Sequence, residues 1–303
     1  MQDIPSYEAV SGGYLPVSAK NPTNLAASIR QKLLNHAKTT RQDFQRVIDG
    51  YAIEGILDRL ANSAYADRFL LKGALLFAVW KGLGQRPTRD IDLMGRGANK
   101  IDSLVRIFEE IVSIDIKDDS IHFSRDAIEG LRIKEDDEYE GVRVNVSGEI
   151  GGAKFKVQID IGFGDAVTPP PVYAAFPRIL PMRTFSLLMY PPETVFSEKL
   201  EAIVSRGMLN RRMKDFYALS ILVKDKMVQP TLVRRAVQNT FERRKTNLPA
   251  TCPVGLSVEF SQDATKIIQW KSFLKKSGLE SGQLSDAIAL IRDFTKRALS
   301  LDW

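Results

Sequence analysis

The sequence is poor in cysteine and histidine. Its 303 residues include one cysteine, Cys252, and two histidines, His36 and His122. A single cysteine excludes a disulfide within the chain. These three residues are also too few for a zinc site built only from cysteine and histidine.

Long hydrophobic runs are absent as well. No apolar segment approaches the roughly 20 residues that cross a bilayer, and the first residues show no basic region followed by an apolar one, as a secretory signal would. We therefore expect a cytoplasmic protein with no membrane partner. Hydrophobic residues make up 44% of the chain and charged residues 26%, which is typical of a soluble globular protein.

Charge is unevenly distributed along the chain. The formal net charge is +6, yet residues 101–150 contain 14 acidic and six basic residues, whereas residues 201–250 contain 11 basic and four acidic residues. The basic segment could bind the phosphates of an RNA, with charge reversal of Arg243 and Arg244 as the test. Its candidate contacts are Arg206, Arg211, Arg212, Arg234, Arg235, Arg243, Arg244 and Lys245. The alternative is a solvated helix face, and composition alone leaves both interpretations open.

Hydrophobic periodicity and proline content divide the chain into four parts. Residues 1–66 form an N-terminal helical segment, and residues 67–168 mix helix and strand. Residues 169–192 contain seven of the 14 prolines, which argues against a regular helix or a central strand, so we interpret this stretch as a connection. Residues 193–303 form a C-terminal helical domain.

The individual elements follow from local patterns. Apolar residues at helical spacing predict helices over 25–36, 44–60, 74–80, 104–112, 192–205, 213–224, 231–243, 262–276 and 284–301. Alternation of polar and apolar residues predicts strands over 90–94, 142–146 and 155–163, and the last two form an antiparallel hairpin with its turn at 148–152.

Three aspartates on two predicted strands form the candidate metal site. Asp90 and Asp92 are two residues apart, so their side chains point to one face of a strand. Asp160 lies on the polar face of the later strand. If the two strands are neighbours, the three carboxylates converge and can hold two magnesium ions. An isolated Asp-x-Asp pair is more often a polar strand face, but its place in an ordered set of motifs favours the metal site.

A glycine turn before the aspartate pair is the candidate phosphate site. Lys72 and Gly73 precede a predicted helix, where free N–H groups can bind phosphate. We therefore assign Lys72, Gly73 and Ala74 to nucleotide binding. Arg89, beside the aspartate pair, is a further candidate phosphate contact, and its alternative is a solvent-facing side chain.

Five segments resemble, in order, the motifs of the AbiEii/AbiGii toxin family, within the polymerase-beta-like nucleotidyltransferase superfamily. They are Phe69–Phe77, Arg86–Leu93, Val157–Asp165, Tyr190–Leu200 and Arg211–Leu219. The resemblance extends over roughly two thirds of the chain. One position departs from the superfamily pattern, because Ala74 follows Gly73 where a second glycine or a serine is usual, which removes a possible hydroxyl ligand to phosphate.

This resemblance implies an α+β fold, with a polymerase-beta-like nucleotidyltransferase core and mixed sheet flanked by N-terminal helices and a C-terminal helical domain. It also implies a magnesium-dependent transfer of NMP from an NTP to an acceptor hydroxyl, with release of pyrophosphate. Asp90 and Asp92 would bind the ions, and Asp160 would complete the ion site and help to deprotonate the hydroxyl.

Two residues of the predicted C-terminal helices join the candidate site through the resemblance. Lys199 lies on a helix with an apolar stripe, and by itself it could be a lysine whose stem covers apolar surface. Asp215 faces inward on the next helix, and by itself it could form a buried salt bridge. The family pattern places both at the active site, with Lys199 holding the triphosphate.

The resemblance further implies a toxin–antitoxin system of the phage-defence type. tRNA is a plausible acceptor, and a separately encoded antitoxin is a plausible partner. Two alternatives stay open. The acceptor could be a protein or a small molecule, or the chain could be a catalytically inactive nucleotide-binding module.

Overall fold

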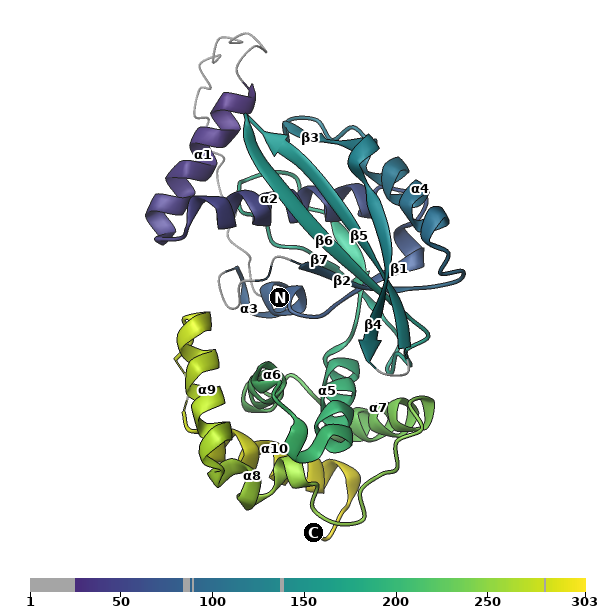
Figure 1. Cartoon of the computed structure of the whole chain (residues 1–303), viewed down its shortest axis with the longest axis vertical. Helices are drawn as coiled ribbons and strands as arrows, with labels where there is room; N and C mark the ends of the chain where they lie inside the picture. The colour runs from purple at the N-terminus through teal and green to yellow at the C-terminus, as the bar shows by residue number, and fades with distance from the viewer. Residues whose placement is uncertain (1–24, 84–87, 89, 137–138, 281) are drawn as a thin grey trace, which may run out of the picture.

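One mixed sheet of eight strands fills the upper half of the molecule in Figure 1, and six helices fill the lower half. The computed structural model describes residues 25–83, 88, 90–136, 139–280 and 282–303. The strands are β1 Phe69–Lys72, β2 Asp90–Gly95, β3 Ile121–Phe123, β4 Glu129–Asp136, β5 Tyr139–Ile150, β6 Ala153–Phe163, β7 Val172–Ala175 and β8 Ser186–Met189.

The helices form two groups: those before β8 lie with the sheet, and those after β8 form a separate layer below it. The helices before β8 are α1 Leu25–Thr40, α2 Phe44–Ala61, α3 Leu75–Lys81 and α4 Ile101–Val112. Those of the lower half are α5 Pro192–Arg206, α6 Met213–Lys224, α7 Pro230–Arg243, α8 Val258–Gln262, α9 Ala264–Ser277 and α10 Leu284–Leu299. The predicted α+β class is confirmed, and each predicted helix is present with its ends shifted by a few residues at most.

The order of strands places the candidate site at the middle of the sheet. The order is β3-β5-β6-β2-β1-β8-β7, and β4 pairs with the part of β5 that β3 leaves open. β2 runs parallel to β6 and antiparallel to β1. The strands that carry the predicted carboxylates are therefore direct neighbours, as the sequence interpretation required.

The predicted hairpin is confirmed, with longer strands than expected. β5 and β6 pair without interruption from Val142 opposite Ile161 to Ile150 opposite Ala153. The turn is made by Gly151 and Gly152, whose φ angles of 54° and 81° suit glycine. The predicted turn over 148–152 was too long, because residues 148–150 pair with both β6 and β3.

The proline-rich segment 169–192 contains two strands that the sequence analysis missed. β8 lies between β1 and β7, with Leu71 opposite Met189 in a parallel pair. The expectation that no inner strand lies here was therefore wrong. The physical reason is local, because the four residues of β8 are free of proline and the prolines stand on either side of them. β8 leads directly into α5, so this segment carries the chain from the sheet to the lower helices.

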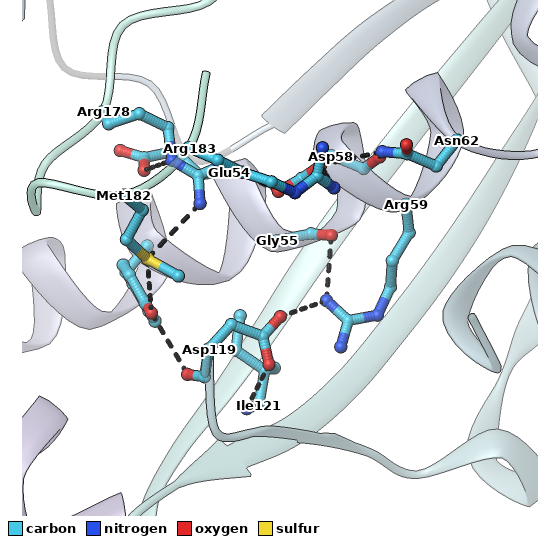
Figure 2. A network of polar contacts seen from close by, with 11 residues as sticks. Glu54, Gly55, Asp58, Arg59, Asn62, Asp119, Ile121, Arg178, Met182 and Arg183 are labelled. Carbon is cyan, nitrogen blue, oxygen red and sulfur yellow. Dashed lines mark hydrogen bonds and ion pairs between the residues drawn. The ribbon is translucent and has the colours of Figure 1, made fainter. Parts of the chain in front are cut away.

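α2 is buried on most of its surface and carries charged residues into the interior (Figure 2). Asp58, 1% exposed, accepts hydrogen bonds from Arg178 at 3.0 Å and Arg183 at 2.8 Å. The next residue, Arg59, pairs with the buried Asp119 at 2.5 Å. These contacts bind the segment around 178–183 and the loop before β3 to α2, since a buried charge requires a partner.

Glu54 makes the stability of this network depend on pH. Burial raises its pKa to about 8, and its Oε1 accepts a hydrogen bond from the N–H of Ile179 at 2.9 Å. Between about pH 4.5 and 8 the folded chain holds a proton that the unfolded chain has released, so the stability that this proton provides falls as pH rises, by about 1.4 kcal/mol per pH unit at most.

We therefore expect Glu54→Gln, which stays neutral, to gain stability relative to the parent protein as pH rises from 5.5 to 8. Chemical denaturation at several pH values measures this difference. The exposed Glu280→Gln is the control and should follow the parent curve. Parallel curves for Glu54→Gln and the parent protein would contradict the assignment.

Among the helices of the described residues, none combines the length and the apolar character that crossing a bilayer requires.

Candidate active site

A cavity of about 510 Å³ lies where the sheet meets the lower helices. Sheet residues and the residues of helices α5 and α6 line it together, with Arg244 at the end of α7. The lining includes Lys72, Asp92, Arg143, Asp160, Asp165, Glu198, Lys199, Arg212, Lys214, Asp215 and Arg244. Five of the residues predicted for the site, Lys72, Asp92, Asp160, Lys199 and Asp215, are thus brought into one cavity.

The strand register explains how Asp92 and Asp160 meet. They are direct partners on the parallel strands β2 and β6, so their side chains lie on the same face of the sheet. Ile91 and Leu93 turn to the opposite face and are fully buried. Asp90 is half-buried and shares the alternation of Asp92, although it is not part of the cavity lining.

Arg143 is a component of the site that the sequence analysis missed. It stands opposite Asp160 on β5, and its Nε and Nη2 donate to the two carboxylate oxygens at 2.7 and 2.9 Å. The hydrogen bond to Asp160 is the main cause that raises the pKa of Arg143, and the charge of Asp90 adds to it. The predicted hairpin contained the signal, because its register places Arg143 across from Asp160.

The three predicted metal ligands are not assembled as one cluster. Within the described part of the chain, no group of three or more aspartate, glutamate, histidine or cysteine side chains is placed to hold a metal ion. Asp160 is directed to Arg143 instead. Asp90 and Asp92 keep the same-face arrangement and offer the oxygen ligands that a hard divalent cation prefers, so these two residues fit a metal ion. The third predicted ligand, Asp160, is bound by the guanidinium of Arg143.

Gly73 provides the space that the Asp92 side chain occupies. Lys72 on β1 stands opposite Asp92 on β2 in the strand register. The chain then turns at Gly73, which has a φ of +75°. A Cβ at Gly73 would lie 1.9 Å from Oδ2 of Asp92. Ala74 follows as the buried N-cap of α3 and makes no side-chain cap. Glycine is thus required here for the position of a carboxylate as well as for the turn.

Gly73→Ala should therefore lower both stability and the nucleotidyl transfer that the family resemblance implies. A left-handed backbone costs an alanine about 1–2 kcal/mol, and the added methyl group would displace Asp92. Gly82→Ala is a matched control, because Gly82 has φ of +86° and open space around its Cβ position. Both variants should lose stability on thermal melting, Gly73→Ala the more because of the contact with Asp92, and only Gly73→Ala should lose transfer. Equal activity of the two would show that Asp92 tolerates displacement.

Lys199 and Asp215 form a buried ion pair between α5 and α6. Nζ of Lys199 lies 2.8 Å from Oδ1 of Asp215, whose side chain is fully buried, and Nε of Arg212 lies 2.8 Å from Oδ2. Burial raises the pKa of Asp215, but the charges of Lys199 and Arg212 lower it more, so the carboxyl has a pKa below its usual value. Lys199 also lines the cavity, so it can serve both as a structural partner and as a contact for substrate.

Lys72 belongs to a second ion network that joins the sheet to α7. Its Nζ lies 3.2 Å from Asp165, which also pairs with Arg244 at 3.3 Å, and Arg244 pairs with Glu201 at 2.8 Å. Burial raises the pKa of Asp165, but the charges of Lys72 and Arg244 lower it by more. The net result is a pKa below the usual value of an aspartate. Lys72 is 6% exposed, and its ammonium contacts the carboxylate of Asp165.

The two arginines singled out as RNA contacts differ in position, because Arg243 is exposed whereas Arg244 is largely enclosed by acidic residues. Nε of Arg243 donates to the carbonyl of Gly164 at 2.6 Å. The Arg244 side chain is 15% exposed and is held by the acidic residues around it. Asp165 and Arg244 were both missed as cavity residues, although Asp165 ends the third family-like segment. Arg89 lies outside the described residues.

Comparison with known proteins identifies the family. A family model described as nucleotidyl transferase AbiEii toxin, type IV toxin–antitoxin system, matches residues 55–290, more than three quarters of the chain. The chain belongs to the AbiEii nucleotidyltransferase toxin family. The AbiEii match begins within α2 and ends within α10, so it includes every element that lines the cavity.

Among solved structures, two from Helicobacter pylori are similar to this AbiEii chain. One is described as a candidate nucleotidyltransferase, with 16% identity, a TM-score of 0.46 and coverage of 89% of this chain and 96% of the other. The second, JHP933, has 17% identity, a TM-score of 0.45 and coverage of 89% and 93%. No curated protein matches the chain. The assignment to the family rests on the family model alone.

Proposed function

We propose that this AbiEii nucleotidyltransferase transfers an NMP group from an NTP to a hydroxyl group of an RNA, with tRNA as the leading acceptor. The oxygen of the acceptor attacks the α-phosphorus, the bond to the β-phosphate breaks, and pyrophosphate leaves. The observation that carries the proposal is the shared cavity, which Asp92 and Asp160 of the sheet line together with Lys199 of α5.

Magnesium fits the aspartate pair better than the full set of three. Asp90 and Asp92 would hold the ion, because they share one strand face and Asp92 is seated against Gly73. When bound, the ion would neutralise charge on the triphosphate and activate the acceptor hydroxyl. For Asp160 to contribute as a ligand for a second ion or as a base, its pair with Arg143 must open, so we assign that role to the substrate-bound state only.

The basic residues around the cavity would position the triphosphate. Lys199 is the strongest candidate, because its ammonium is directed into the cavity wall beside Asp215 and a compact cation suits phosphate. Arg143 is a second candidate, since it already faces two carboxylates and could transfer its hydrogen bonds to phosphate oxygens. Lys72 would act through Asp165, by keeping β1 fixed relative to α7.

Family membership also supports an antitoxin partner, which we propose to be a separately encoded protein. Two alternative functions are also to be tested. A protein or small-molecule acceptor would use the same cavity, and an inactive nucleotide-binding module would bind NTP without transfer.

Two assays separate these possibilities. Thermal melting with each NTP, with and without magnesium, should show stabilisation that requires both, about 2.7 kcal/mol at a ligand concentration of one hundred times Kd. Incubation with α-labelled NTP, magnesium and total RNA or protein should label RNA only. Labelled protein would identify the other acceptor class, and stabilisation without any labelled product would identify an inactive module.

A further inference from the structure

A second, larger hollow of about 970 Å³ adjoins the active-site cavity. The start of α2, the chain entering α6, and α9 form its walls. Its lining contains the five basic residues Arg46, Arg211, Arg212, Lys214 and Lys276 and, among the described residues, no aspartate or glutamate. We call this hollow the basic groove.

The basic groove and the active-site cavity share two wall residues. Arg212 and Lys214 line both of them. Arg212 also pairs with Asp215, which pairs with Lys199. A ligand that lies in the groove is therefore next to the residues proposed to hold the triphosphate.

The groove combines cations with apolar surface. Arg46, Arg211, Lys214 and Lys276 are exposed. On α9, Ile268 is 64% exposed, and the half-buried Phe273 packs against Tyr217 and Trp270. Cations along a backbone path with an aromatic or apolar wall are typical of single-stranded nucleic acid sites, where phosphates meet the cations and bases meet the wall.

We propose that the basic groove binds the single-stranded end of the acceptor RNA and directs its terminal hydroxyl into the active-site cavity. This inference rests on the proposed function and adds the path of the acceptor to it. The groove lies outside the candidate metal site, since Asp92 lines only the cavity. The nucleotide can thus occupy the cavity while the RNA occupies the groove.

Two neighbouring lysines of α9 provide a matched test. Lys275 and Lys276 are both exposed and both in the last turn of the helix, but only Lys276 lines the groove. Charge reversal at either position changes the interaction with the helix dipole alike. We expect Lys276→Glu to raise the RNA concentration for half-maximal transfer by about tenfold or more, and to reduce the log–log salt slope of RNA binding by about 0.7. Lys275→Glu should stay within about twofold of the parent protein.

The whole 303-residue chain serves as the enzyme, with α-labelled NTP and total RNA as the probes. Gel shifts at several salt concentrations give the slope. Thermal stabilisation by NTP should be equal in all variants. Arg211→Glu, on the opposite wall, should reproduce the effect of Lys276→Glu and covers the case in which that variant folds poorly. If the parent protein labels RNA and both lysine variants behave alike, the groove is not the path of the acceptor, whereas the proposed function stands. If the parent protein labels no RNA, both proposals are overturned.

Discussion

Asp92→Asn is expected to abolish nucleotidyl transfer while the protein stays folded. Asp92 lies against Gly73 on the face of β2 that lines the cavity. Asparagine has nearly the same shape, so the turn and the strand pairing should persist. The loss of one carboxylate at a site that stabilises transferring phosphate should lower kcat at least about a hundredfold, or about 2.7 kcal/mol of barrier.

Two measurements check this result. Initial rates with labelled NTP give the loss of transfer, and circular dichroism melting shows whether the fold is retained. Asp126→Asn, an exposed aspartate outside the cavity, is the control and should keep the parent rate. A folded Asp92→Asn protein with full activity would remove Asp92 from the mechanism.

Lys199→Ala should also lose transfer at least about a hundredfold, because the cavity would lose the cation proposed to hold the triphosphate. The substitution also breaks a buried ion pair, which can cost about 3–5 kcal/mol when a charge is left without a partner. Arg212 still pairs with Asp215 at 2.8 Å, so we expect a smaller loss of stability.

A double variant separates the catalytic from the structural role of Lys199. Lys199→Ala with Asp215→Asn removes the buried negative charge along with its partner, so stability should recover relative to Lys199→Ala alone, while transfer should stay lost. Lys224→Ala, at the exposed end of α6, is the control for removing a lysine. If Lys199→Ala melts at a lower temperature and keeps the parent specific activity, the lysine is structural only.

The parts of the fold that the sequence predicts are those with strong local patterns. The alternation in β2 and in the β5–β6 hairpin follows from period-two burial, and α6 matches its predicted bounds because its apolar residues repeat at helical spacing. The same-face placement of Asp90 and Asp92 follows from the alternation alone, before any tertiary contact is known.

The parts that could not be predicted depend on contacts between distant segments. β8 has four residues and is defined by its pairing with β1, more than 100 positions earlier in the chain, so no local pattern marks it. β3 and β4 likewise depend on the open edge of β5. The network of Lys72, Asp165 and Arg244 joins three separate segments, and the sequence contains no spacing that would link them.

The direction of Asp160 shows a further limit of sequence reasoning. The aspartate lies on the predicted face beside Asp92, yet Arg143 from the other neighbouring strand binds both of its oxygens. Spacing along one strand indicates the face of a side chain, whereas the choice between a metal and an arginine depends on the residue across the pair.

The most direct test of nucleotidyl transfer compares two labels on the same NTP in the same reaction with magnesium and RNA. We expect the label at the α-phosphorus to become attached to RNA and the label at the γ-phosphorus to appear only in pyrophosphate, with neither change in the Asp92→Asn protein. A γ-label on the acceptor would indicate phosphoryl transfer, and release of inorganic phosphate with no labelled acceptor would indicate hydrolysis. Either result would contradict the proposed reaction.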